Sequence, residues 1–166
     1  MQVAKEKETV ESTLRRFSTF RIDGRLYGVD IQDVKEINTE KKFTPIFHAP
    51  KEVKGYINIR GQVYLLLDLR LIFGFEAKEI SSASRVVLFM PEVGDPCGIL
   101  VDSIDDVVTV DHNLIENRRQ SHETHKGDDR RGVDVGEGVC KLEEELLIIL
   151  NARKLLNNIG KLEQRR

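Results

Sequence analysis

Two cysteines and two histidines of this chain could nominally supply the four ligands of a metal site. They are Cys97, Cys140, His122 and His125, and zinc is commonly bound by thiolate and imidazole groups. The two histidines are three residues apart in a highly charged stretch, whereas each cysteine lies in an apolar, strand-like pattern. The spacing is also one residue short of the helical His-Glu-x-x-His signature of metalloproteases. We therefore interpret the cysteines as small buried hydrophobic residues in a reducing compartment, and we expect no metal and no cofactor.

A cluster of carboxylates is the second group that could do chemistry. Asp102, Asp105 and Asp106 could include a general acid and a general base, but solvated carboxylates at the end of a strand are the simpler interpretation. The sequence has no Gly-x-Ser-x-Gly elbow, no Walker-type phosphate loop and no Gly-x-Gly-x-x-Gly. We therefore predict no catalytic residues, and we expect a protein that is not an enzyme and that works through its surfaces.

Composition limits the partners of those surfaces. The 166 residues include 26 basic and 28 acidic side chains, which gives a net charge of −2 with both signs interspersed. A basic face for nucleic acid is therefore not evident, although a small nucleic-acid-binding β-barrel remains a distant alternative. No apolar run is long enough for a membrane span, and the N-terminus has no signal-peptide apolar region. We expect a cytoplasmic protein.

Short strands are the elements that must position these residues. Apolar and polar residues alternate on both sides of Arg60-Gly61, which predicts a hairpin with strands over 56–59 and 63–69. Arg60 then lies at the turn, where it is either an ordinary solvated charge or a presented binding group. Asp23-Gly24 predicts another hairpin. Leu155, Ile159 and Leu162 have helical spacing and predict a C-terminal helix.

The hydrophobic pattern occurs twice along the chain. Residues 55–73 align with 138–156 at a shift of 83, and residues 28–37 align with 98–107 at a shift of 70. Matching glycines and a shared Asp/Asn-x-Arg element favour an internal duplication over a chance match of alternating segments. The difference between the shifts indicates an insertion of about 13 residues in the second copy.

Two copies of a small β unit predict a mainly β fold with two compact barrels. We expect the first barrel over roughly 17–75 and the second over roughly 84–150, with strand exchange between them allowed. The polar segment 76–84 is the expected connector. The remaining segments are predicted as a flexible tail (1–16), a charged surface loop (111–137), and a C-terminal helix and tail (151–166).

These residues resemble the CheW family of bacterial chemotaxis adaptors from about Phe17 to Leu156. The matching motifs fall in the order Tyr27-Gly28-Val29-Asp30-Ile31, Val34-Lys35-Glu36-Ile37, Thr44-Pro45, Ala49-Pro50, Val53-Lys54-Gly55-Tyr56-Ile57-Asn58-Ile59-Arg60-Gly61-Gln62-Val63, Leu67-Asp68-Leu69-Arg70, Gly98-Ile99-Leu100-Val101-Asp102 and Leu147-Ile148-Ile149-Leu150. The resemblance implies two side-by-side SH3-like five-stranded β-barrels with a short connecting helix and a C-terminal helix.

The resemblance also implies a function and a site. A non-catalytic adaptor would couple transmembrane chemoreceptors to a CheA-type histidine kinase, recruited from the cytoplasm to receptor arrays. The first barrel would bind the kinase's regulatory domain, and the second would join adaptor and kinase units into rings. The hairpin tip of a receptor would bind in a groove whose matching positions are Val34, Glu36, Gly55, Arg60, Val86, Val87, Gly98, Ile104 and Val107. For some of the valines, a place in the barrel core is the simpler interpretation.

Three departures from the family pattern bear on the partner. Phe47 and Leu65 stand where the family commonly has proline, and Asn117-Arg118-Arg119 stands where it often has a proline pair. These changes leave the fold prediction intact. They weaken the prediction of the partner, because strand ends and loops make the contacts with partner proteins. A related kinase pathway, such as that of twitching motility, is the alternative.

Overall fold

The computed structural model describes residues 13–117 and 135–163. Its strands are β1 (Leu14–Ile22), β2 (Arg25–Asp30), β3 (Val34–Asn38), β4 (Val53–Ile59), β5 (Gln62–Asp68), β6 (Arg85–Phe89), β7 (Cys97–Val101), β8 (Ser103–Ile104), β9 (Val108–Asp111), β10 (Glu116–Asn117), β11 (Gly136–Lys141) and β12 (Leu146–Leu150). The helices are α2 (Leu69–Ile72), α3 (Ala152–Glu163) and the short 3₁₀ turns η1 (Ile31–Asp33) and η2 (His112–Leu114).

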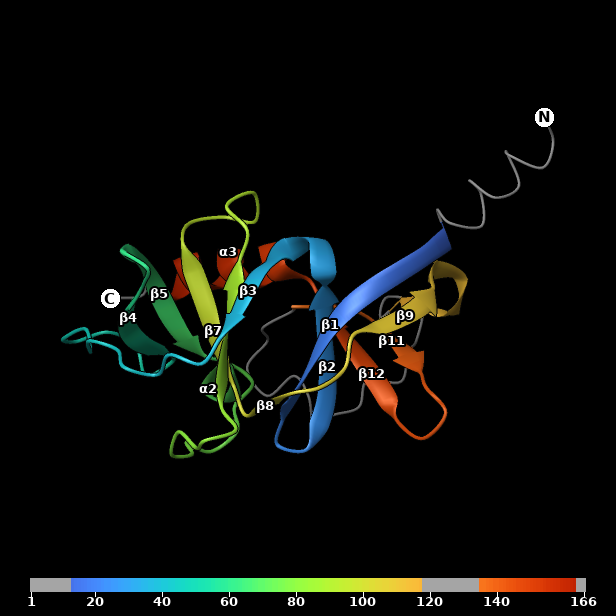
Figure 1. Cartoon of the computed structure of the whole chain (residues 1–166), viewed down its shortest axis with the longest axis horizontal. Helices are drawn as coiled ribbons and strands as arrows, with labels where there is room; N and C mark the ends of the chain where they lie inside the picture. Colours follow the sequence, from blue (N-terminus) through green and yellow to red (C-terminus); the bar gives the residue numbers. More distant parts are fainter. Residues whose placement is uncertain (1–12, 118–134, 164–166) are drawn as a thin grey trace.

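The strands form two sheets that lie side by side along the long axis (Figure 1). The five-stranded sheet has the order β3-β6-β7-β5-β4. The other sheet has seven strands in place of the expected five, in the order β10-β11-β12-β2-β1-β8, with β9 also paired to β1. Two of these strands, β8 and β10, have only two residues each. The mainly β class predicted from the sequence is confirmed.

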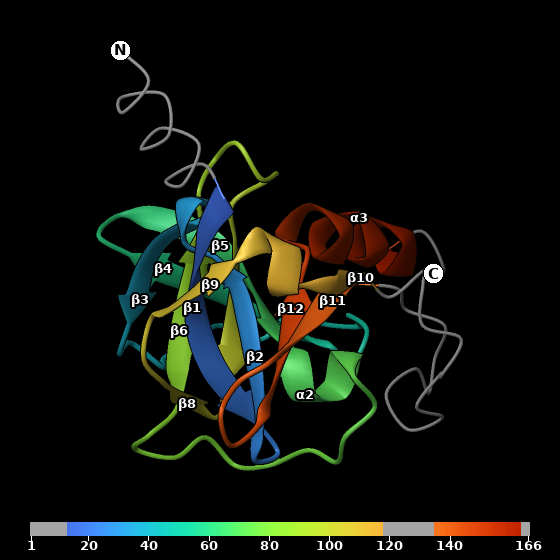
Figure 2. The ribbon, with the colours of Figure 1, turned by 90° about the vertical axis from the view of Figure 1, so that its right-hand side faces the viewer.

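The two halves of the chain exchange strands between the sheets. The hairpin β1–β2 joins the C-terminal strands, because β2 pairs in parallel with β12, and the hairpin β6–β7 joins β3, β4 and β5 through the parallel pair β5–β7. Figure 2 shows β12 beside β2, with α3 above them and α2 below. The barrels are therefore not contiguous segments over 17–75 and 84–150, and the strand exchange allowed by the sequence analysis is extensive.

The exchange has the regularity of a duplicated unit. Leu66 pairs in parallel with Gly98, and the aligned residue Ile149 pairs in parallel with Gly28. The register of β4–β5 shifts between Val53 and Gly55, and that of β11–β12 shifts between Gly136 and Gly138. These pairings follow both alignment shifts found in the sequence, so they support the inferred duplication.

The ends of the duplicated hairpins are also alike. The Asp68 carboxylate accepts a hydrogen bond from the backbone NH of Leu71 at the start of α2, and the Asn151 side chain accepts one from Lys154 at the start of α3. Both side chains cap a helix that follows the hairpin, and such caps stabilise helix starts. In α3 the side chains of Leu155 and Ile159 are buried, as their spacing predicted, whereas the side chain of Leu162 lies outside the described residues.

The buried hydrophobic residues form three clusters, one of which joins the two sheets. One cluster consists of residues of the five-stranded sheet and includes Ile57, Tyr64 and Leu66. A second consists mainly of residues of the seven-stranded sheet and includes Phe17 and Leu147. The third and largest cluster takes residues from both sheets and from α3. The halves therefore share a core, as expected for units too small to fold alone.

The segments outside the expected barrels need two corrections. The tail predicted over 1–16 ends earlier than expected, because β1 begins at Leu14 and pairs with β9. Within the surface loop predicted over 111–137, residues 111–117 form the end of β9, η2 and β10, and β11 starts at Gly136. Residues 118–134 of that loop lie outside the described residues.

Candidate partner-binding site

Arg60 lies at the tip of the hairpin β4–β5. Ile59 pairs with Gln62, which leaves Arg60 and Gly61 as a two-residue turn. Both residues have positive φ, 53° for Arg60 and 85° for Gly61, the combination that a type I′ turn requires. The side chain of Arg60 is 79% exposed. The turn therefore presents a guanidinium to solvent on a rigid hairpin.

Three polar contacts connect this hairpin to β3 at the opposite end of the sheet. Arg60 Nη1 donates to Glu36 Oε2 over 2.8 Å. Lys35 Nζ donates to the Tyr64 hydroxyl over 3.0 Å, and it lies 3.4 Å from Gln62 Oε1. Since β3 and β4 are the two ends of the strand order, these contacts close the five-stranded sheet on itself.

Two predicted groove residues, Val86 and Val87, lie in the core. Both are fully buried in β6, which lies between β3 and β7. Val86 belongs to the cluster inside the five-stranded sheet and Val87 to the cluster shared between the sheets. Because β6 has a hydrophobic core on each face, neighbouring residues that point in opposite directions are both buried. Both side chains therefore pack in the core, and burial argues against their predicted contact with a receptor.

Two predicted glycines have structural roles beneath the surface. Gly55 has a φ of +147°, and a Cβ there would lie 2.0 Å from the carbonyl oxygen of Thr44. This close approach allows Thr44 and Tyr56 to form an isolated β-bridge. At Gly98 a Cβ would lie 2.8 Å from Leu88 Cδ2. Both glycines are buried, so they shape the sheet and do not offer a side chain to a partner.

The other predicted groove residues have at least partial access to solvent. Val34 in β3 and Ile104 in β8 are half-buried and pack against the core shared by the two sheets. Val107 is half exposed. Both β3 and β8 lie in the middle of the molecule, where the sheets meet (Figure 1). Together with the Glu36–Arg60 pair, these residues form the reduced set of candidates for a receptor contact.

Sequence reasoning missed the apolar residues exposed on the five-stranded sheet. Tyr56, Val63 and Ile37 are 49%, 51% and 40% exposed. Tyr56 and Val63 lie on the outer face of neighbouring strands, since Asn58 pairs with Val63 and Tyr56 pairs with Leu65. The alternation of residues around Arg60 assigned Tyr56 and Val63 to the solvent-facing side of the hairpin. An aromatic residue and a valine on a solvent-facing side were the sequence signal that could have indicated an exposed apolar surface.

Two carboxylates of the acidic cluster identified in the sequence, Asp102 and Asp105, form ion pairs. Arg70, at the end of α2, donates to Asp102 Oδ2 over 2.7 Å and lies 3.3 Å from Asp23 Oδ1. Arg21 donates to Asp105 over 2.9 Å and to Glu145 over 2.7 Å. The pKa of Asp105 is lowered, mainly by a hydrogen bond from the backbone NH of Asp106 and to a smaller extent by the contact with Arg21. Asp102 and Asp105 therefore have a structural role as ion-pair partners.

The two cysteines among the four nominal zinc ligands lie far apart in the fold. Cys97 lies in β7 and Cys140 in β11, in different sheets and different hydrophobic clusters, and both are buried and free. Burial raises the pKa of the Cys140 thiol, which disfavours the thiolate that metals bind. His122 and His125 lie outside the described residues. Among the residues described, no group of three or more acidic, histidine or cysteine side chains could hold a metal.

Comparison with known protein families gives the site its context. A family model described as the CheW-like domain matches residues 16–160, which is most of the chain. The chain belongs to this family. The resemblance found in the sequence is confirmed, and with it the assignment to chemotaxis signalling as an adaptor.

Individual CheW proteins are similar over most of their length. The chemotaxis protein CheW of Rhizobium meliloti is 30% identical over 131 residues, which cover 78% of this chain and 84% of the relative. CheW of Bacillus subtilis is 27% identical over 146 residues, covering 87% and 88% of the two chains. The crystal structure of the scaffolding protein TtCheW from Thermoanaerobacter tengcongensis has a TM-score of 0.70 and 28% identity, covering 82% of this chain and 88% of that one.

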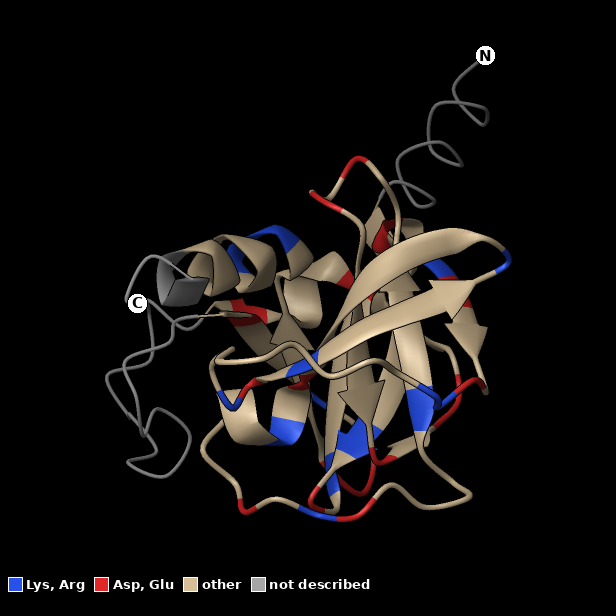
Figure 3. Cartoon of the chain, turned by 90° about the vertical axis from the view of Figure 1, so that its left-hand side faces the viewer, with Lys and Arg blue, Asp and Glu red and all other residues tan. Residues whose placement is uncertain are grey.

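Two surface properties complete the description of this CheW-like fold. Basic and acidic segments alternate over the face drawn in Figure 3, in agreement with the interspersed charges of the sequence. Among the helices of the described residues, none has the length and apolar character needed to cross a membrane.

Proposed function

We propose that this CheW-like chain is a non-catalytic adaptor that couples the cytoplasmic hairpin tips of transmembrane chemoreceptors to the regulatory domain of a CheA-type histidine kinase. The match of the family model to residues 16–160 is the observation that carries the proposal. In this role the chain acts in the cytoplasm and is recruited to receptor arrays at the membrane. It also joins kinase units and further adaptor copies into rings.

We assign receptor binding to Arg60, Glu36, Val34, Ile104 and Val107. An apolar stripe on a receptor helix can pack against the partly exposed valines and the isoleucine, since helices commonly bind partners through apolar anchors in a groove. Arg60 and Glu36 can pair with charges on the same helix. Charges at the rim of an interface mainly set its orientation and association rate. The rigid turn of Arg60 keeps the ordering cost of such a contact low.

We assign kinase binding to the exposed apolar residues of the five-stranded sheet. Tyr56 and Val63 lie on its outer face, and aromatic residues are frequent anchors of protein interfaces. A kinase regulatory domain on this face and a receptor helix near β3 and β8 would occupy different surfaces of one molecule. Simultaneous binding of both partners is what an adaptor requires.

Calorimetric titration tests this proposal. The purified chain is titrated with a receptor-tip fragment, with the regulatory domain of a CheA-type kinase, and with each partner after saturation by the other. We expect saturable binding in each case with dissociation constants near the micromolar range. Tyr56→Ser with Val63→Ser should weaken kinase binding at least tenfold and leave receptor binding unchanged. Leu14→Ser is the matched control, since Leu14 is 48% exposed on the other sheet. Binding to neither partner would overturn the proposal.

A further inference from the structure

Asp102 is the single residue between a strand of one sheet and a strand of the other. The strand β7 belongs to the five-stranded sheet and ends at Val101, whereas β8 begins at Ser103 and belongs to the seven-stranded sheet. Among the described strands, the chain passes between the sheets at one other point, η1, which lies between β2 and β3. The backbone conformation at Asp102 therefore helps to set the angle between the two sheets.

Hydrogen bonds from both sheets hold Asp102 at this crossing. Its backbone NH donates to the Arg21 carbonyl over 3.1 Å. Its Oδ2 accepts from the Asp23 backbone NH over 2.9 Å and from Arg70 Nη1 over 2.7 Å. Arg21 and Asp23 belong to the β1–β2 hairpin of the seven-stranded sheet, whereas Arg70 lies in α2, which directly follows β5 of the five-stranded sheet. The Asp102 carboxylate therefore links elements that belong to different sheets.

Arg70 makes its contacts from a buried position, since it is 9% exposed. Its guanidinium also lies 3.3 Å from Asp23 Oδ1, and its Nε donates to the Glu76 carbonyl over 3.0 Å. A guanidinium is planar and holds its donors in fixed directions, and a partly buried ion pair is only weakly screened by salt. Arg70 therefore ties α2 to the crossing residue in one orientation.

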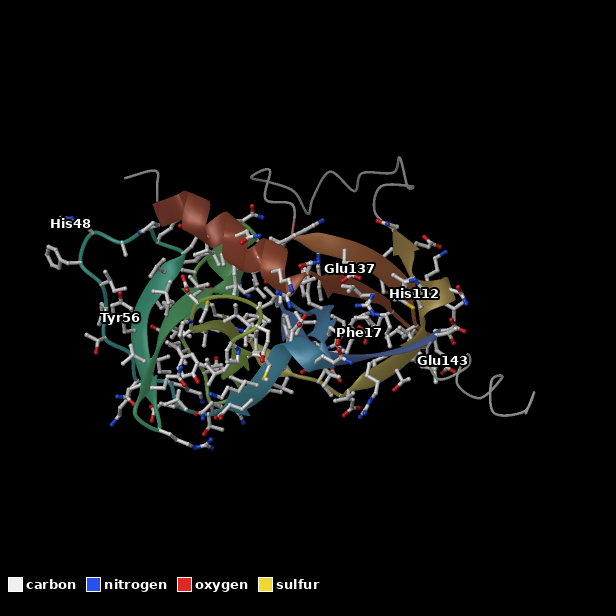
Figure 4. The ribbon with its side chains drawn as sticks, turned by 90° about the horizontal axis from the view of Figure 1, so that it is seen from above. Phe17, His48, Tyr56, His112, Glu137 and Glu143 are labelled. Carbon is white, nitrogen blue, oxygen red and sulfur yellow. The ribbon has the colours of Figure 1, made fainter. Side chains whose placement is uncertain are left out.

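The crossing lies between the two sides of the candidate receptor site. Ile104 is in β8, which begins directly after Asp102, whereas Val34 is in β3 of the other sheet. Both side chains pack against the core that the sheets share. From this junction the sheets extend in opposite directions, as the positions of Tyr56 and Glu143 show (Figure 4). A different angle at the crossing would therefore change the spacing between Val34 and Ile104.

We propose that Arg70 is a positioning residue for receptor binding. Through its ion pair with Asp102 it fixes the angle between the sheets, and with it the distance between the two sides of the receptor site. The inference rests on the proposed function, because a receptor helix is the ligand of that site. The surface assigned to the kinase, around Tyr56 and Val63, lies within one sheet and does not depend on this angle. Loss of the ion pair should therefore affect receptor binding selectively.

A distance between the sheets tests the first step without any partner. Spin labels are placed at Val63→Cys in β5 and Lys141→Cys in β11, in a chain whose buried Cys97 and Cys140 are replaced by alanine. Double electron–electron resonance then measures the distribution of distances between the labels. We expect Arg70→Met to widen or shift this distribution. An unchanged distribution would overturn the inference.

Two further variants make this measurement specific. Arg85→Met is the matched control, because Arg85 donates to the carbonyls of Ser82 and Ser84 in its own segment, and it should leave the distribution unchanged. Asp102→Asn removes the charge that Arg70 contacts but retains an oxygen that can accept from the Asp23 NH. It should change the distribution in the same direction as Arg70→Met, and it carries the test if Arg70→Met does not fold.

Calorimetric titration tests the second step. Arg70→Met should raise the dissociation constant for a receptor-tip fragment roughly fivefold, an effect typical of residues that act on a site through coupled elements. Binding of the kinase regulatory domain should be unchanged. Adding Asp102→Asn to Arg70→Met should cause little further loss, since both variants break one ion pair. Equal weakening of both partners, or additive losses, would overturn the inference and leave Arg70 with a general structural role.

The two measurements also separate this inference from the proposed function. An unchanged chain that does not bind a receptor tip would overturn both. Normal receptor binding by Arg70→Met and Asp102→Asn would overturn the positioning role alone, and the assignment of the chain as an adaptor would stand.

Discussion

The guanidinium of Arg60 lies 2.8 Å from the carboxylate of Glu36, and this contact links the two ends of the five-stranded sheet. The two partners differ in exposure, 79% for the Arg60 side chain and 20% for that of Glu36. Glu36 is thus held within the surface, whereas most of the Arg60 side chain remains available to a partner. An exposed ion pair of this kind contributes at most about 1 kcal/mol to stability.

Arg60→Glu should weaken receptor binding without unfolding the protein. The substitution places a carboxylate beside Glu36 and reverses the charge at the hairpin tip. We expect the dissociation constant for a receptor-tip fragment to rise at least tenfold, about 1.4 kcal/mol. Calorimetry measures this change, and a urea titration checks the fold. Arg16→Glu, an equal charge change at an exposed position of β1, is the control. An unchanged constant for Arg60→Glu would remove this residue from the site.

Gly55→Ala should be strongly destabilising. An alanine Cβ would lie 2.0 Å from the Thr44 carbonyl oxygen at a φ of +147°. Backbone strain of this type costs on the order of 1–3 kcal/mol before the steric clash is counted, so we expect a loss of at least about 2 kcal/mol in the free energy of unfolding. Gly24→Ala is the matched control, because Gly24 also has a positive φ but nothing within 4 Å of its Cβ position. Equal losses for both variants would show that the Thr44 contact is unimportant.

Two fragments divided in the connector, residues 1–78 and 79–166, should assemble into one folded complex. Each fragment alone should remain unfolded, since each sheet needs strands from both halves. Co-purification and circular dichroism measure the assembly. Gly28→Val in the first fragment should prevent it, because a Cβ at Gly28 lies 3.1 Å from Leu147 Cδ1 in the parallel pair β2–β12. A folded first fragment on its own would contradict the strand exchange.

Stability should fall at acid pH through the carboxylates that contact Arg21. The hydrogen bond from Arg21 lowers the pKa of Glu145, and the Asp106 backbone and Arg21 lower that of Asp105. Both folded-state pKa values lie below the unfolded values of about 4. The stabilisation is therefore complete above that pH and is lost as the pH falls through the folded values. Urea midpoints of the unchanged chain and Arg21→Met should differ at pH 7, and the difference should shrink as the pH falls below about 4. A constant difference would exclude this linkage.

Local features of the fold were accessible from the sequence. The turns at Asp23-Gly24 and Arg60-Gly61 could be predicted because a two-residue hairpin turn needs positive φ angles, which glycine adopts easily. All four residues have positive φ in the structure. The stripe of Leu155 and Ile159 predicted α3 because the side chains of a helix repeat along one face. Each of these features depends on residues close together in the chain.

The pairing of distant strands was not accessible in the same way. Alternation shows that Leu66 belongs to a strand, but it carries no information on whether the neighbouring strand contains Gly28 or Gly98. The same limitation affected the site. Val86 and Val87 could have formed a groove or a core, and only the presence of strands and clusters on both sides of β6 decides between them.

The order in which the strands are joined constrains how this protein is made. β2 pairs with β1 on one side and with β12, which ends at residue 150, on the other. Before β12 is synthesised, the hairpin β1–β2 lacks the neighbour that covers the edge of β2. Contacts so distant in sequence form slowly and leave strand edges unpaired in the meantime. The seven-stranded sheet is therefore completed only after β12 has been synthesised, and until then the outer edge of the β1–β2 hairpin is open to pairing with other chains.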